Sequence, residues 1–251
     1  MFISYMKAEN LKLKRTFARK MIGIVPLLTV AFSFIMNMEY FVYLTFNWWS
    51  ILFMPMMIAL FCALAHVREK QASNYNGIYS APVDLRLVWL AKASVIALYS
   101  LSSQLIFLVV MFLIEMVVPL FPVGPFPVIA ACFLLWATTL WQIPFCLLLA
   151  KKFGFAVSLI VNLFGCLAFG IIAATKAYWW AWPWSWPIRA MSPTIGIHPN
   201  GLPLEEGDPL LSMTVIPIAI ILSLLLFAVL LMISGKSFAF AVVQKSKQEV
   251  A

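Results

Sequence analysis

The sequence is poor in charge. Only 10% of its 251 residues are Asp, Glu, Lys or Arg, whereas 64% are hydrophobic. Soluble domains are about a quarter charged and about half apolar. A soluble fold of this length could not cover so much apolar surface, so the composition indicates that lipid is the main solvent of this chain.

The residues that usually carry chemistry are also scarce. The chain has two histidines, His66 and His198, which cannot form a zinc cluster by themselves. Its four cysteines lie inside apolar runs without paired spacing and are typical of small core residues: they are Cys62, Cys132, Cys146 and Cys166. The Gly-Lys-Ser at 235–237 lacks the glycine that a phosphate-binding loop needs five residues earlier. We therefore expect no catalytic residue, no metal site and no bound cofactor in this chain.

Long apolar runs dominate what remains. Each is about long enough to cross the hydrocarbon core as a helix, and none shows the period-two alternation of a strand. The runs are 21–38, 48–65, 93–113, 128–150, 153–175 and 213–233. The sequence thus predicts an all-α membrane protein with six transmembrane helices over 21–233. The first run has no small-residue cleavage pattern after it, so we interpret it as a retained span and not as a signal peptide.

The distribution of Lys and Arg predicts the orientation of these spans. With the N-terminus inside, fifteen of the seventeen basic residues face the cytoplasm, and only Lys176 and Arg189 lie outside. The inner side then carries a net charge of +11 and the outer side −3. Short cytoplasmic loops are enriched in Lys and Arg. We therefore expect both termini in the cytoplasm, with 1–20 as an N-terminal segment and 234–251 as a tail.

The N-terminal segment has the pattern of an amphipathic interfacial helix. One face gathers large apolar side chains: Phe2, Ile3, Met6, Leu13 and Phe17. The opposite face is basic: Lys7, Lys12, Lys14, Arg15 and Arg19. Such a helix could serve only as an anchor and topology signal, or it could also contact a cytoplasmic partner. The sequence leaves both open.

The cytoplasmic loop 66–92 is longer than a turn between two spans requires. We predict a polar helical stretch from Arg68 to about Tyr75, with Gly77 as its C-cap. Pro82 prevents its continuation, and Asp84 can cap the next helix. A short helix in this place favours docking to another protein over a simple solvated turn.

The outer loop 176–212 is rich in Trp and Pro, which suits either an aromatic belt with a structured cap or an exit gate for an amphipathic molecule. Polar side chains within the spans are either packing contacts or part of a substrate path. The candidate path and gate residues are Gln104, Glu115, Gln142, Asn162, Trp180, Trp182, Trp184 and Trp186.

Three segments resemble a known family. Residues 8–16 (AENLKLKRT) and the loop from Glu69 through 80–83 (SAPV) to 90–92 (LAK) resemble ABC-2 type permease subunits. The outer segment WPWSWP at 182–187, with its continuation through 192–209, resembles the lantibiotic-immunity branch (MutE/EpiE type) more narrowly. The resemblance extends over essentially the whole chain.

This resemblance implies a role in transport. Such a permease pairs with a second related permease, or a second copy of itself, and with two copies of an ABC ATPase that uses ATP and Mg. It would export a lantibiotic peptide from the cell membrane and so protect the producer. The N-terminal helix would be the connecting helix, and the segment after the fifth span an outer re-entrant cap. A cytoplasmic coupling helix between spans two and three would contain the residues that contact the ATPase: Arg68, Glu69, Lys70, Asn74 and Tyr75.

Two alternatives remain open, and a third lacks the residues it would need. The chain could be an ABC-2 exporter of another amphipathic peptide or of a lipid-linked glycan. It could be a membrane scaffold or sensor that transports nothing. An intramembrane enzyme would need convergent ionisable or metal-binding side chains, and the sequence offers no such set.

Overall fold

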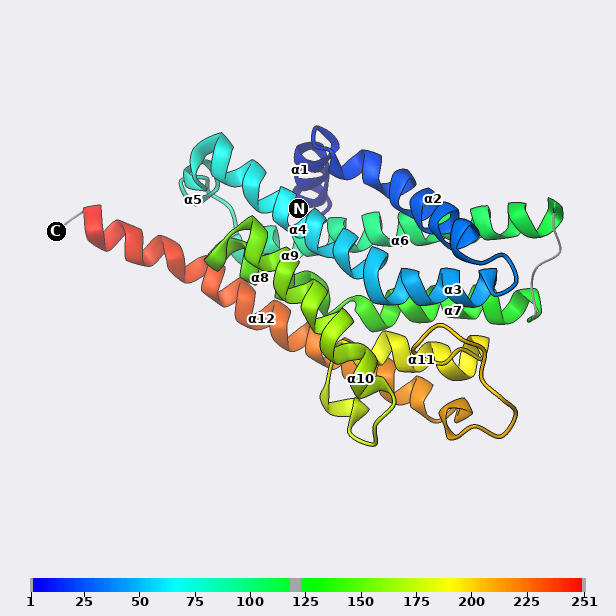
Figure 1. The fold of residues 1–251 in the computed structure, drawn as a ribbon. Helices are drawn as coiled ribbons and strands as arrows, with labels where there is room; N and C mark the ends of the chain where they lie inside the picture. The colour runs from blue at the N-terminus through cyan, green and yellow to red at the C-terminus, as the bar shows by residue number, and fades with distance from the viewer. Residues whose placement is uncertain (1, 118–122, 250–251) are drawn as a thin grey trace.

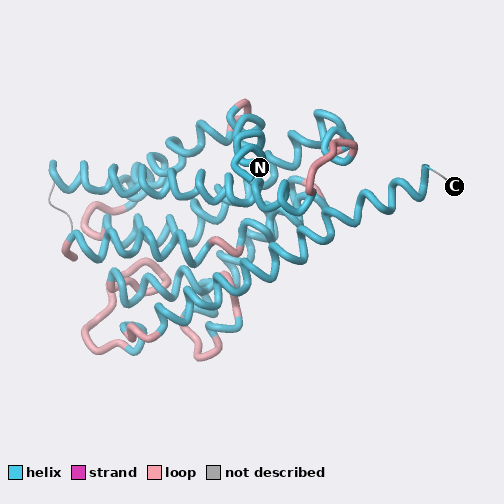
Figure 2. Tube along the Cα trace, turned by 180° about the vertical axis from the view of Figure 1, so that it is seen from behind, coloured by secondary structure: helices cyan, strands magenta, loops and turns pink. Residues whose placement is uncertain are grey.

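The computed structural model describes residues 2–117 and 123–249, with side chains as far as Phe240. Within these ranges the chain is helical, and its only pairing outside helices is an isolated bridge between Ile197 and Pro203. Figure 2 shows the helices running roughly side by side, joined by loops that gather at the two ends of the bundle.

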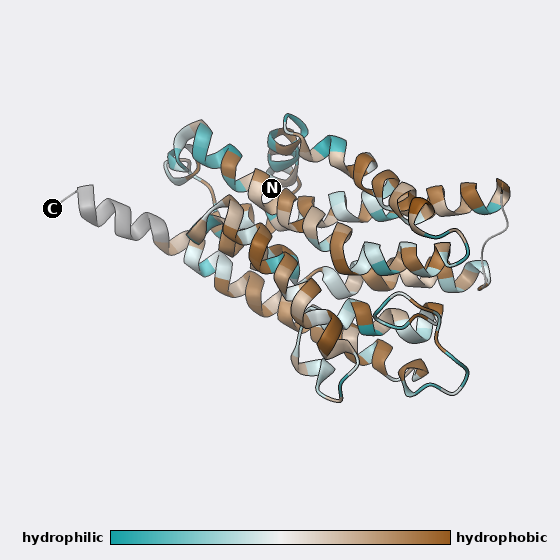
Figure 3. Cartoon of the chain, in the orientation of Figure 1, coloured by the Kyte–Doolittle hydropathy of each residue, from teal (hydrophilic) through white to brown (hydrophobic). Residues whose placement is uncertain are grey.

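Six of the helical segments are long and apolar enough to cross a membrane. They are Ala18–Met36, Phe41–Ser73, Leu85–Val117, Pro125–Phe153, Phe155–Ala174 and Val215–Phe240. The prediction of an all-α membrane protein with six spans is thus confirmed. Figure 3 shows hydrophobic residues along most of these helices and hydrophilic residues on α1 (Phe2–Lys14) and around the end of α4.

Several spans consist of more than one element. The second joins α3 (Phe41–Trp48), the π-helix η1 (Trp49–Phe53) and α4 (Met54–Ser73). The fourth joins α7 (Pro125–Thr139) and α8 (Gln142–Phe153). The fifth joins α9 (Phe155–Phe164), the π-helix η2 (Gly165–Gly170) and α10 (Ile171–Ala174). The first is α2 (Ala18–Met36), the third α6 (Leu85–Val117), and the last lies in α12 (Val215–Glu249).

Two of these helical segments are longer than a membrane requires. Phe41–Ser73 and Leu85–Val117 each contain 33 residues, which is about 50 Å of helix, against about 30 Å of hydrocarbon. Their joined ends, with the short helix α5 (Asn76–Tyr79), lie at the same end of the molecule as the end of α12 (Figure 1). The stretch 234–249, expected as a tail, is a helical continuation of the last span.

Trp49 lies inside the second span and not at its start. Its side chain is fully buried and stacks on Phe107, with ring centroids 4.6 Å apart. The reason is that the helix begins at Phe41, eight residues before Trp49, which moves the indole about 12 Å along the axis from the helix start. Trp89 is also buried, because the end of α12 covers it and Ser234 accepts its indole N–H at 2.8 Å.

The segment 176–212, predicted to lie outside, contains η3 (Trp179–Ala181), α11 (Ser185–Ile195) and η4 (Pro209–Leu211). Every residue of α11 except Thr194 is buried, and this helix packs against α7, α10 and α12. The buried Arg189 donates to the carbonyl oxygens of Leu210 and Pro209, at 2.5 and 3.5 Å. The segment is therefore a packed cap, and its depth in the membrane stays a prediction.

Candidate functional site

The end of α4 forms a compact turn. α4 ends at Ser73, and Asn74 takes the left-handed conformation (φ 48°), with its N–H directed to the carbonyl oxygens of Glu69 and Lys70. Asn74 is thus the C-cap, and the prediction of Gly77 as the cap is wrong. Asparagine tolerates this conformation better than most residues. Asp84 caps α6 as predicted, because its carboxylate accepts from the N–H groups of Arg86 and Leu87.

Tyr75 follows in the same left-handed region, with φ 68°, a conformation that costs a bulky residue about 1–3 kcal/mol. Its phenol oxygen lies 2.9 Å from His66 Nδ1, and its ring stacks on Tyr79. Burial raises the pKa of the Tyr75 phenol, and the nearby Glu69 carboxylate raises it further. These contacts hold the strained residue in one position, so the turn is rigid where it leaves α4.

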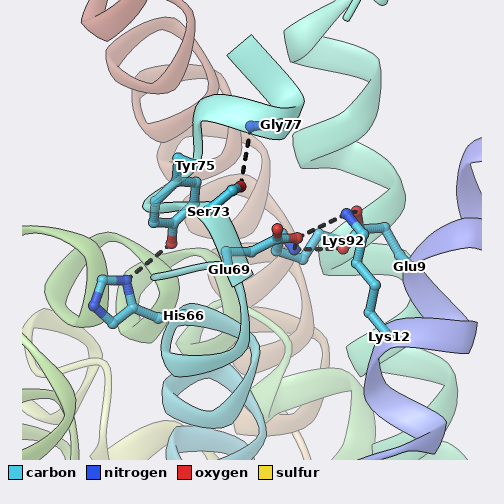
Figure 4. A network of polar contacts seen from close by, with 8 residues as sticks. All are labelled: Glu9, Lys12, His66, Glu69, Ser73, Tyr75, Gly77 and Lys92. Atoms are coloured by element: carbon cyan, nitrogen blue, oxygen red, sulfur yellow. Dashed lines mark hydrogen bonds and ion pairs between the residues drawn. The ribbon is translucent and has the colours of Figure 1, made fainter. Parts of the chain in front are cut away.

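A ring of four charged side chains lies beside this turn (Figure 4). Lys12 Nζ donates to Glu9 Oε1 at 2.6 Å and to Glu69 Oε1 at 2.7 Å. Lys92 Nζ donates to Glu69 Oε1 at 2.9 Å and also to Glu9 Oε2. Each lysine therefore contacts both glutamates, and we call Glu9, Lys12, Glu69 and Lys92 the ion ring.

The ion ring is electrically neutral and almost closed to solvent. Glu9, Glu69 and Lys92 are 2%, 4% and 2% exposed, and Lys12 closes the side nearer solvent. Charges can be buried at this depth only when they are paired and hydrogen-bonded. The ring joins three elements that are far apart in the sequence, α1, α4 and α6, and so ties the N-terminal helix to the loop between spans two and three.

The predicted ATPase-contact residues separate into two groups. Arg68, Lys70 and Asn74 are exposed. Glu69 and Tyr75 are buried, in the ion ring and against His66, and their predicted contact with the ATPase stays a prediction. The helix turns 100° per residue, which directs Glu69 inward while its neighbours on both sides face out.

Three ring residues, Glu9, Lys12 and Lys92, were not identified as site residues from the sequence. A signal for Glu9 exists, because on a helical wheel it falls at the edge of the apolar face, next to Phe2 and Leu13. An acid among apolar side chains needs a buried cation. Which cation supplies the charge depends on how α1 crosses α6, and a single sequence does not contain that information.

A second polar cluster lies within the bundle, where α8, α9 and the segment before α11 meet. Asn162 Nδ2 donates to Gln142 Oε1 at 3.1 Å and to the Pro55 carbonyl at 2.8 Å. Trp184 Nε1 donates to Asn162 Oδ1 at 2.9 Å. The hydrogen bond across helices between Gln142 and Asn162 is thus present as expected, and it leads to the tryptophan segment.

Three of the other predicted path residues lie apart from this cluster, and two tryptophans join it. Gln104 accepts from Trp49 Nε1 at 2.7 Å in a separate contact between α6 and η1. Glu115 is half-buried near the end of α6, and Trp180 is mostly exposed. Trp182 and Trp186 do join the cluster, because Trp182 packs against Trp184 and Trp186 packs against Trp141.

Comparison with known proteins identifies the superfamily. A family model described as "ABC-2 family transporter protein" matches residues 5–173, a stretch that contains the ion ring and the Gln142–Asn162 pair but ends before α11. No curated protein and no solved structure matches the chain. Since the matched stretch is more than half of a chain with six membrane-spanning helices, this multi-pass membrane protein belongs to the ABC-2 family of transporter proteins.

Proposed function

We propose that this chain is the permease subunit of an ABC transporter that exports a lantibiotic-type peptide from the cell membrane and so gives self-protection. Membership of the family implies an ABC ATPase partner. The peptide cargo is supported by the resemblance of the outer segment 182–209 to lantibiotic-immunity permeases. In this proposal two copies of the ATPase bind ATP and Mg, and the chain pairs with a related permease or with itself.

The ion ring is the observation that carries the proposal. A motor that pushes on the end of α4 can move the spans only if the push reaches several helices. The ring fixes α1, α4 and α6 together at that end through three charge-assisted hydrogen bonds between elements, and a fourth lies within α1. Such bonds are about twice as strong as neutral ones. Closure of the ATPase dimer would then move the three helices as one rigid body.

The exposed side of the same turn supplies the docking surface in this proposal. Arg68, Lys70 and Asn74 face solvent at the end of α4. Glu69 and Tyr75 act from inside, by fixing the position of that surface. With both termini in the cytoplasm, this surface faces the ATPase.

The outer half of the path would involve α11 and the polar cluster beneath it. Three buried donors around these elements have no hydrogen-bond partner among the described residues: Trp141 Nε1, Gln142 Nε2 and Ser192 Oγ. Unpaired buried donors are costly. Displacement of α11 would expose them to a peptide, whose carbonyl groups could accept from them. The alternative role of this cluster is helix packing alone.

The test is a double charge reversal, Arg68→Glu with Lys70→Glu, introduced into the chain in its native host. We expect the ATPase to be lost on affinity purification of the permease, and sensitivity to the cognate lantibiotic to rise to that of a deletion strain. The physical reason is that two attractive charges on the docking surface become repulsive, which costs several kcal/mol at an interface.

The matched control is Lys14→Glu with Arg15→Glu, which makes the same charge change at exposed positions on and just after α1. This variant should keep both the ATPase and resistance. Retention of the ATPase by the Arg68/Lys70 variant would contradict the docking surface. An ATPase that co-purifies with the wild-type chain, while deletion leaves sensitivity to all lantibiotics unchanged, would indicate a different cargo.

A further inference from the structure

A basic cavity of about 520 Å³ opens beside the turn after α4. It lies between the C-terminal ends of α4 and α8, with α5 forming part of its wall. Its lining residues are His66, Lys70, Asn74, Tyr75, Tyr79, Lys151, Lys152, Phe153 and Gly154. None of the four ion-ring residues lines it, so the cavity is a separate feature of this end of the molecule.

The cavity carries strong positive charge. Three lysines line it, Lys70, Lys151 and Lys152, and no carboxylate does. None of these three lysines forms an ion pair with a described side chain. The four ion pairs among the described residues all belong to the ion ring. The C-terminal ends of α4 and α8 add roughly half a negative charge each, which three ammonium groups outweigh.

The backbone adds a further positive element. Gly154, with φ 92°, separates α8 from α9 and lines the cavity, and no side chain caps the first N–H groups of α9. An uncapped helix N-terminus attracts anions through its free N–H groups and its dipole. The three lysines therefore line one space, which borders the residue before this helix end and suits a phosphate group.

The surroundings match a lipid better than a free ion. Phe153 lines the cavity and is 63% exposed, and Phe155 on the other side of Gly154 is 37% exposed. Lys151 and Lys152 lie where spans four and five meet, at the expected headgroup level. Apolar rings beside ammonium groups place acyl chains and a headgroup phosphate next to each other.

We propose that this cavity binds the phosphate headgroup of an anionic phospholipid. Placement in the inner leaflet rests on the proposed orientation, whereas binding itself does not depend on the proposed cargo. The bound headgroup contacts Lys70 and lies against Asn74 and Tyr75. It therefore neutralises part of the charge next to the proposed docking surface and makes the coupling end of the permease sensitive to lipid composition.

The experiment measures phosphatidylglycerol binding to the purified full-length chain by native mass spectrometry, with phosphatidylcholine as the neutral lipid. We expect Lys151→Gln with Lys152→Gln to weaken phosphatidylglycerol binding about 30-fold, since each lysine near a headgroup contributes about 1 kcal/mol. Phosphatidylcholine binding should not change. Lys151→Arg with Lys152→Arg keeps the charge and should bind like the wild type.

Arg19→Gln with Lys20→Gln removes two exposed charges at the start of α2, far along the chain from the cavity, and should leave binding intact. Equal losses in this control and in the cavity variant would overturn the proposal. So would displacement of the lipid by millimolar inorganic phosphate, which would indicate a free-anion site. If the cavity variant bound phosphatidylglycerol normally but lost the ATPase, the cavity would receive acidic side chains of that partner, and the lipid proposal would be wrong.

Discussion

Lys92 is the more deeply buried of the two lysines in the ion ring. It is nearly inaccessible and contacts both glutamates. Lys92→Met would leave two carboxylates facing each other with only the partly exposed Lys12 between them. We expect the free energy of unfolding to fall by about 3 kcal/mol, the cost of leaving a buried charge without its partner. Unfolding in SDS mixed micelles would measure the loss.

Two further variants separate charge pairing from general damage at this position. Lys14→Met removes an exposed lysine at the end of α1 and should change the stability little. Adding Glu69→Gln to Lys92→Met leaves a single pair, Glu9 with Lys12, and should recover part of the loss. Equal stability of Lys92→Met and Lys14→Met would show that the ring does not hold α1 against α4 and α6.

The contact between η2 and the segment before α11 depends on a glycine, Gly165, which has no side chain. A Cβ atom at Gly165 would lie 2.3 Å from the Trp184 indole. Gly165→Ala should therefore push Trp184 away from Asn162 and lower the stability by about 1–3 kcal/mol, as overpacking does. A shift in tryptophan fluorescence together with a lower unfolding midpoint would report it.

Gly23→Ala in α2 is the matched control for Gly165→Ala, because a Cβ atom at Gly23 would meet nothing within 4 Å. Alanine is a better helix former than glycine, so Gly23→Ala should be neutral or slightly stabilising. If Gly165→Ala behaves in the same way, the cap does not depend on close contact between Trp184 and the η2 backbone.

The two ends of the molecule are expected to face opposite sides of the membrane, and labelling can test this orientation. Single cysteines at Ala72 and Glu206 would occupy exposed positions at opposite ends of the bundle, while the four native cysteines are buried. We expect a membrane-impermeant maleimide to label Glu206→Cys in intact cells, and Ala72→Cys only after lysis. Labelling of Ala72→Cys in intact cells would reverse the orientation and remove the basis for ATPase docking at this turn.

Some features of this protein follow directly from the order of its residues. Six apolar runs predict six spans, because lipid leaves the backbone no partner outside a helix. The Asp84 cap also follows from local pattern. In each case the deciding interaction is short-range, or it is imposed on every spanning helix by the same solvent.

Other features were decided only when helices met. The ion ring needs Glu9, Lys12, Glu69 and Lys92 on three elements to converge, and nothing in their spacing encodes that crossing. Trp49 and Trp89 are buried because Phe107 and the end of α12 cover them. Asn74, and not Gly77, is the C-cap of α4, and the next residue, Tyr75, contacts His66. Hydropathy determines which segments enter the membrane, but the pairing of buried charges and rings depends on distances between helices, which only the packed bundle establishes.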